Sequence, residues 1–184
     1  MWSSRDLALV VLFPIVNVIY TYLFGQLGWM LLGVPGSNMA LIIGGVIINS
    51  VALLMFEGRR WRFFLMQLIF IILILPTNLL GTPFDILPRL PSLINAIHAD
   101  ILYNSIYGFF NNRNQLKLWV TICLVEFFLV NPLLTAIGFT FLFPPDFVST
   151  FIMVALLLLP VSIAESIIGS LIGFKLYEKT KRIG

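Results

Sequence analysis

The chain has 184 residues, of which 60% are hydrophobic and only 10% are charged. A soluble domain carries about a quarter of charged residues because its surface faces water, so this composition excludes a soluble globular protein and indicates a surface that faces lipid. The net charge of +3 alone could suggest a nucleic-acid partner, but the positions of the basic residues, given below, indicate none. The single cysteine, Cys123, cannot form an intramolecular disulfide, and its apolar surroundings predict inert packing.

Apolar runs long enough to cross a bilayer follow one another along the chain. The hydrocarbon core of a membrane, about 30 Å thick, needs roughly 20 residues of apolar helix. Six runs approach this length, and glycine, proline or charged residues separate them. They cover residues 7–32, 39–56, 63–80, 90–110, 118–143 and 147–174. The sequence therefore predicts an all-α integral membrane protein, in which residues 1–184 form a single domain, a six-transmembrane-helix bundle.

The first run resembles a signal peptide only in that a basic residue, Arg5, precedes it. It is longer than the apolar core of a signal, and no small-x-small cleavage site follows it. We interpret it as a retained span. Its outer half carries Asn17, Tyr20 and Trp29, and aromatic side chains at that depth usually anchor a helix at the interface.

The basic residues predict the orientation. Segments between six spans alternate between the two sides of the membrane, and the side that holds both termini receives ten of the eleven basic residues. The other side receives only Arg89. Basic residues accumulate on the cytoplasmic side, so both termini are expected in the cytoplasm of a cell-membrane protein. The positive charge then serves topology and anionic lipid headgroups.

Polar side chains inside the spans are functional candidates, because a bilayer makes them costly. The run at 90–110 holds Asn95, Asp100, Asn104 and the only histidine, His98. We interpret Asp100 and Asn104 as polar packing between helices. For Asn95 and His98, contact with a ligand and polar packing are equally compatible with the sequence.

The last run carries small residues at regular spacing. Glu165, Gly169 and Gly173 recur at every fourth position, so they share one face of a helix. Small residues at this spacing allow two helices to approach closely. The face is expected to pack within the bundle first, although it could also dock a partner helix.

Motifs of the common enzyme classes are missing. The sequence has no phosphate-binding loop, no His-Glu-x-x-His, no Gly-x-Ser-x-Gly and no Cys-x-x-Cys pair. One histidine and one cysteine make a histidine- or thiolate-based metal centre unexpected. The sequence therefore predicts no catalytic residue, no cofactor and no metal site.

The layout resembles the substrate-binding S components of energy-coupling factor (ECF) vitamin transporters. The resemblance rests on the basic turn at 57–62, the proline-rich loop at 81–91, the stretch 90–100 that ends in Ala99-Asp100, and the final helix at 160–177 with its basic tail. It covers nearly the whole chain. It implies a binding subunit of an ABC importer that captures a small vitamin-like metabolite from the outer face.

The resemblance also implies where this subunit binds its substrate and its partners. The pocket would lie in the outer half and draw on Trp29, Asn78, Asp85, Arg89, Asn95, His98 and Asn131. The first helix would dock a transmembrane coupling subunit through an Ala-x-x-x-Ala face, where this chain has Ala8 followed by Leu12, and Gly169 and Gly173 form a second candidate surface. Energy would come from ATPase subunits supplied in trans, since this chain has no phosphate-binding loop.

Two other functions remain open from the sequence. One is an intramembrane enzyme that uses Asp100, His98 and Glu126, although these residues lie at different depths and no second histidine is present. The other is a non-catalytic membrane assembly protein, in which every polar residue serves packing.

Overall fold

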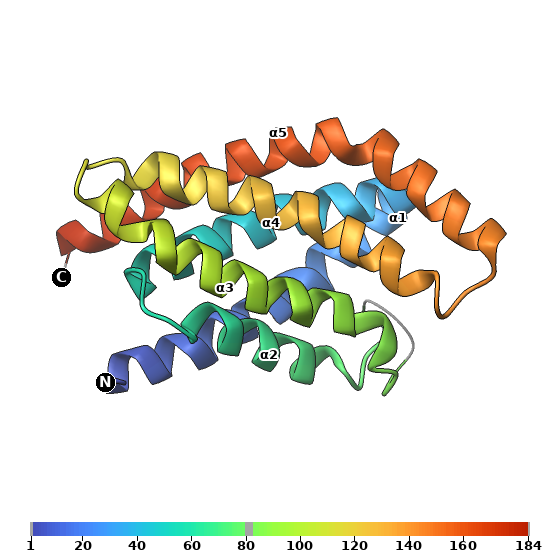
Figure 1. Ribbon diagram of the computed structural model, residues 1–184, viewed down its shortest axis with the longest axis horizontal. Coiled ribbons are helices and arrows are strands. Elements are labelled where there is room, and N and C mark those ends of the chain that lie inside the picture. The colour runs from blue at the N-terminus through green and yellow to red at the C-terminus, as the bar shows by residue number, and fades with distance from the viewer. Residues whose placement is uncertain (1, 80–82, 184) are drawn as a thin grey trace.

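The computed structural model describes residues 2–79 and 83–183, except for the side chains at 26, 28–29, 32–40 and 182–183. Within this part the chain is helical and contains no strand. The elements are α1 (Ser4–Phe56), α2 (Arg62–Ile74), the short 3-10 helix η1 (Leu87–Arg89), α3 (Leu90–Asn111), α4 (Leu116–Phe139) and α5 (Pro145–Ile183) (Figure 1). The all-helical part of the prediction is confirmed.

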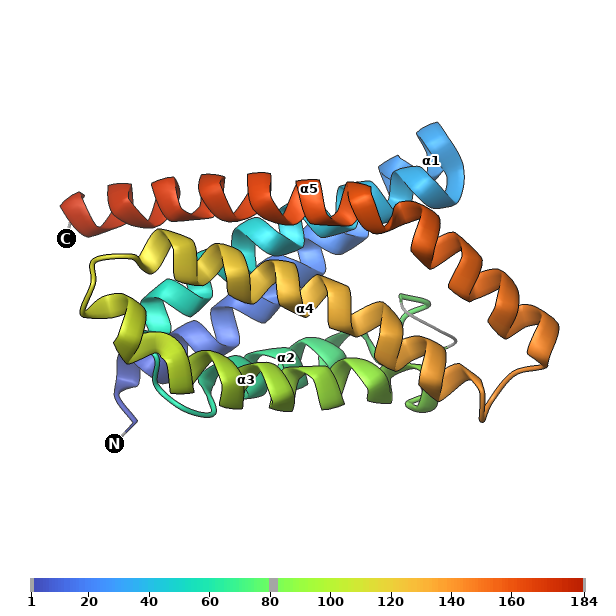
Figure 2. The ribbon, with the colours of Figure 1, turned by 45° about the horizontal axis from the view of Figure 1, so that its top comes forward.

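Helix α1 folds back on itself. A straight helix of 53 residues would be about 80 Å long. Instead, Gly25 lies against Leu41 and Gly44 lies against the ring of Tyr20, so a first arm (Ser4–Gly25) runs beside a second arm (Leu41–Phe56). Figure 2 shows this reversal at the end of the molecule away from the N-terminus. The glycines and proline at 33–38, which separate the first two predicted runs, fall within this reversal, and the backbone there is helical.

Three of the described helices are long and apolar enough to cross a membrane. They are the first arm of α1, α4 and residues Pro145–Lys181 of α5. The second arm of α1 and α2 are apolar but shorter. Helix α2 ends at Ile74, before the predicted boundary at 80, because Pro76 has no N–H to continue the helix. The Ile74 carbonyl accepts instead from Thr77, whose N and Oγ1 lie 2.9 and 2.7 Å away.

Both chain termini lie at the same end of the bundle. The turns at 57–61 and 112–115 lie there as well, whereas residues 75–79, 83–86 and 140–144 lie at the other end (Figure 1). We call the end that holds both termini the basic end, because the segments there carry nearly all lysines and arginines. Arg89 belongs to the opposite end. The fold thus separates the basic residues in the way that the alternation of segments predicted.

Ion pairs close the basic end of the α1 hairpin. Asp6 is buried, and its carboxylate lies 3.1 Å from Arg59 Nη1 and 2.9 Å from Arg62 Nη2. The ring of Trp2 lies 4.5 Å below the Arg62 guanidinium, and Ser3 caps the first turn of α1 with Asp6. These contacts hold the start of the first arm against Arg59 and Arg62, which follow directly after the second arm.

Two glycines let α5 pack directly on the second arm of α1. A Cβ atom on Gly169 would lie 2.8 Å from Val46 and 3.1 Å from the Ile43 carbonyl oxygen, and one on Gly173 would lie 2.9 Å from the Ile47 carbonyl oxygen. These distances leave no room for a side chain, as expected for small residues at a close helix contact.

Replacing Gly173 by leucine should therefore lower the free energy of unfolding by about 1–3 kcal/mol, because the new side chain forces α5 away from α1. The midpoint of thermal unfolding in detergent measures the change. Ala164→Leu is the matched control, since Ala164 is exposed on the same helix. Equal midpoints for the two variants would show that this contact does not hold the helices together.

Candidate functional site

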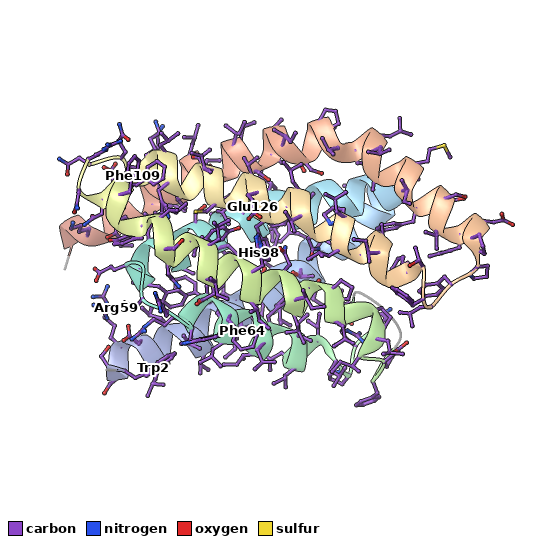
Figure 3. All side chains as sticks on the ribbon, viewed as in Figure 1. Trp2, Arg59, Phe64, His98, Phe109 and Glu126 are labelled. Carbon is purple, nitrogen blue, oxygen red and sulfur yellow. The ribbon has the colours of Figure 1, made fainter. Side chains whose placement is uncertain are left out.

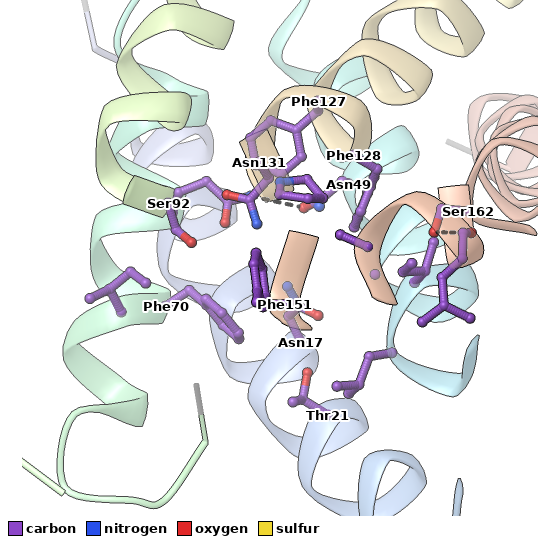
Figure 4. A pocket seen from close by; sticks show the side chains of 18 of the residues that line it. Asn17, Thr21, Asn49, Phe70, Ser92, Phe127, Phe128, Asn131, Phe151 and Ser162 are labelled. Carbon is purple, nitrogen blue, oxygen red and sulfur yellow. Dashed lines mark hydrogen bonds between the residues drawn. The ribbon is translucent and has the colours of Figure 1, made fainter. Parts of the chain in front are cut away.

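A cavity of about 370 Å³ lies between the two arms of α1 and helices α2, α4 and α5, with Ser92 of α3 at its edge (Figure 4). Its lining comes from the middle of these helices and from the halves nearer the opposite end. Pockets that bind small molecules usually measure about 300–1,000 Å³, so this cavity has the size for a small ligand.

The lining combines amides and hydroxyls with aromatic rings. The amide and hydroxyl groups come from Asn17, Thr21, Asn49, Gln67, Ser92, Asn131 and Ser162. The rings come from Phe70, Phe127, Phe128 and Phe151. Mostly apolar walls with a few polar groups at fixed positions are typical of ligand sites.

Helical spacing and two special residues create the cavity. On the first arm, Asn17 and Thr21 lie one turn apart and so face the same side. Gly45 on the second arm leaves space, since a Cβ atom there would contact only the ring of Phe128, at 3.7 Å. Pro132 in α4 has no N–H, so the Phe128 carbonyl loses its usual helical partner beside the cavity.

Two amide side chains of the lining bond to each other, and the acceptor oxygen of a third has no hydrogen bond. Gln67 Nε2 donates to Asn49 Oδ1 at 3.1 Å, which links α2 to the second arm of α1. The Oδ1 atom of Asn131 is buried and accepts no hydrogen bond from the described residues. A buried acceptor without a donor costs free energy. A ligand that donates a hydrogen bond to Asn131 would remove that cost.

Among the residues predicted for the pocket whose side chains the structure describes, only Asn131 lines this cavity. Asn95 is completely buried behind the wall, where its Nδ2 donates to the Phe127 carbonyl at 2.9 Å and its Oδ1 has no partner among the described residues. His98 points to α4, with its Nδ1 3.4 Å from Glu126 Oε1, and its side chain is 46% exposed (Figure 3). His98 therefore does not reach the cavity in this structure.

The loop residues that were predicted for the pocket do not line the cavity. Arg89 is fully buried, and its guanidinium donates to the carbonyls of Thr77, Leu79 and Asp85, which shapes the loop before α3. Asn78 is exposed, and neither it nor Asp85 nor Arg89 lines the cavity. The side chain of Trp29 lies outside the described residues.

The predicted docking residues separate into an outward and an inward group. Ala8 is exposed on the first arm of α1, beside Leu12, which is 54% exposed. Gly169 and Gly173 are buried in the contact between α5 and α1. The two glycines therefore serve packing inside the chain and present no outward face.

The three residues of the enzyme alternative do not meet. Asp100 Oδ1 accepts from the backbone N–H of Phe63 and Phe64 at 3.0 and 3.2 Å, and Oδ2 accepts from Trp61 at 2.6 Å. Asp100 therefore caps α2, whereas His98 and Glu126 face each other between α3 and α4. Among the described residues no group of three or more histidine, cysteine or acidic side chains could hold a metal ion.

Most of the polar residues that line the cavity were not predicted from the sequence as site residues. Asn49 and Gln67 lie inside predicted spans, so the cost of a polar group in a bilayer already marks them as candidates in the same way as His98. Asn17, which the sequence places in the outer half of the first span, is buried and lines the cavity. The sequence did offer one sign of this lining, because Asn17 and Thr21 lie one helical turn apart and so share a face.

Comparison with protein families, with curated proteins and with solved structures finds no match for this chain. The resemblance drawn from its layout therefore gains no support from a relative. The function has to be argued from the cavity and from the arrangement of the helices.

Proposed function

We propose that this chain is a membrane-embedded substrate-binding subunit of an ECF-type importer, which captures a small vitamin-like metabolite from the outer face. The cavity carries the proposal. Its volume of about 370 Å³ suits a small molecule, and its lining mixes amides with phenylalanine rings. An assembly protein whose polar residues only pack would have no use for such a space.

The distribution of charge supports the orientation. Both termini and the basic turns share one end of the bundle, which we assign to the cytoplasm by the positive-inside rule. The two arms of α1 and helices α2 to α5 then form the six spans. The cavity, which lies toward the opposite end, is loaded from outside.

Transport in this proposal depends on partners. The chain supplies the binding site, while a transmembrane coupling subunit and ATPase subunits supply the energy. The exposed face of the first arm of α1 around Ala8 is the surface we assign to the coupling subunit, because Gly169 and Gly173 are already in contact with α1.

Labelling of single cysteines tests the orientation. In a Cys123→Ala background, Asn112→Cys should react with a membrane-impermeant maleimide only from the cytoplasmic side, and Phe84→Cys only from outside. Both positions are exposed, and they lie at opposite ends of the bundle. Reaction of both from the same side would contradict the six-span arrangement.

A cavity-filling variant tests binding. Gly45→Leu places a side chain in the cavity with little strain, because a Cβ atom at Gly45 makes only one ordinary contact. After incubation with a deproteinised metabolite extract and re-isolation in detergent, the unmodified chain should retain a small molecule that mass spectrometry identifies. Gly45→Leu should retain at least about tenfold less of it, the effect of 1.4 kcal/mol.

Gly108→Leu is the matched control, because it also replaces a glycine by leucine. Gly108 is an exposed residue of α3, and a Cβ atom there would meet no other atom within 4 Å. This variant should retain the molecule as well as the unmodified chain does. If all three proteins carry the same small molecules, the cavity is not a binding site.

A further inference from the structure

The cavity contains no charge of its own. None of the described residues that line it is acidic, basic or a histidine. On α5, Glu165 is buried and its Oε2 has no partner among the described residues, but it does not line the cavity. The acids on α3 and α4 have partners of their own. Glu126 accepts from the Tyr103 hydroxyl at 2.7 Å and faces His98, and Asp100 caps α2.

The lack of charged residues in the lining restricts which ligands the cavity can bind. A carboxylate, phosphate or ammonium group loses several kcal/mol of hydration on burial unless an opposite charge or several hydrogen bonds replace the water. The lining supplies no opposite charge, and four phenylalanine rings take up much of the wall between its few polar groups. Burial of an ionised group in this cavity would therefore cost more than burial of an uncharged one.

A helix N-terminus is the other common site for an anion, and α3 begins near Ser92 at the edge of the cavity. Two of its first donors are not available. The Leu90 N–H donates to the Ile86 carbonyl at 3.1 Å, and Pro91 has no N–H. The first turn of α3 therefore offers an anion fewer donors than an open helix N-terminus does.

The hydrogen-bonding groups of the cavity favour an amide-like ligand. An asparagine or glutamine side chain donates and accepts side by side, so it matches a group that does the same. Asn131 offers an open buried acceptor, and the bond between Gln67 and Asn49 uses only part of the capacity of these two amides. The rings of Phe70 and Phe151 offer apolar surfaces for a flat molecule (Figure 4).

We propose that the cavity selects an uncharged, ring-containing molecule with an amide- or imide-like edge, and that it rejects compounds ionised at neutral pH. This inference rests on the proposed binding function and adds the chemical class of the substrate. It also predicts that Asn131 meets the polar edge of the molecule.

The incubation with a metabolite extract described above also tests the chemical class of the ligand. The molecule that Gly45→Leu loses and Gly108→Leu keeps is identified, and its charge at pH 7 follows from its structure. An uncharged ring compound supports the inference. An ionised compound would overturn the inference and leave the binding function intact, whereas loss of no compound, or of a lipid only, would overturn both.

Variants of Asn131 provide a second measurement with the identified compound. Asn131→Leu removes the amide at nearly constant volume and should weaken binding about 5- to 150-fold. Asn131→Asp should also weaken binding of an uncharged compound, because it places a charge in an apolar cavity. Tighter binding by Asn131→Asp would show that the cavity suits a cation and would contradict the inference. Thermal unfolding of both variants in detergent confirms that they remain folded.

Discussion

Replacement of Asp100 by alanine is expected to lower the free energy of unfolding by about 3 kcal/mol or more. The Asp100 carboxylate accepts from three backbone N–H groups at the start of α2, and α2 has no side-chain cap of its own. Each buried donor that loses its acceptor costs about 1–3 kcal/mol. Trp61, which precedes α2, has a positive φ of 69°, so the bond from its N–H to Asp100 also holds an unfavourable backbone conformation.

Thermal unfolding in detergent, followed by tryptophan fluorescence, measures this loss. Asp100→Asn keeps one acceptor oxygen and should recover part of the stability. Asp146→Ala removes an exposed acid from the first turn of α5 and should change the stability by less than about 1 kcal/mol. If Asp100→Ala unfolds like the Asp146 variant, the carboxylate is not the clamp that holds α2 on α3.

Replacement of Asp6 by alanine should destabilise the protein by about 3–5 kcal/mol, the usual effect of removing one partner from a buried ion pair. The side chains of Asp6 and Arg62 are 2% and 8% exposed, so the Arg62 guanidinium stays buried after it loses this carboxylate. Arg59 is 45% exposed, and its pair with Asp6 is screened by water. Arg59→Ala should therefore cost no more than about 1 kcal/mol.

A double variant distinguishes loss of charge pairing from loss of packing. Asp6→Leu combined with Arg62→Met removes both charges and keeps apolar volume, so it should be more stable than Asp6→Ala. The unfolding midpoints of the three proteins measure the difference. A double variant less stable than Asp6→Ala would contradict the view that the loss comes from removing the carboxylate beside the buried Arg62 guanidinium.

The sequence predicted the helices well, because composition and the spacing of apolar residues report directly on burial in lipid. The chain reverses between Gly25 and Leu41, as the glycine and proline at 33–38 indicate, although the backbone there is helical. The error at α2 has a local cause. Pro76 ended α2 six residues early, because a missing N–H stops a helix whatever the hydropathy of the following residues.

The site was harder to predict than the fold. The cost of a polar group in a bilayer marks a residue as important, but it does not say which neighbour satisfies that group. His98 and Asn49 look alike by this criterion. Helix contacts decide that His98 meets Glu126 and that Asn49 meets Gln67 beside the cavity, and those contacts are not encoded in the spacing along one helix.

Arg89 illustrates the same difficulty in a loop. It is the one basic residue of the opposite end, which suggested a contact with a ligand's charge. The surrounding loop contains Pro76, Pro83 and Pro88, which donate no backbone hydrogen bond, so its carbonyl groups lack local donors. The guanidinium has five donors and satisfies several of these carbonyls at once.

The closed hairpin of α1 also bears on how the chain crosses the membrane. Asp6 precedes Arg59 by 53 residues, so these ion pairs join the two ends of the hairpin and require the second arm to return beside the first. In the orientation proposed above, a second arm that failed to return would leave Arg59 and Arg62 on the other side of the membrane from Asp6. The ion pairs are therefore compatible only with the closed hairpin.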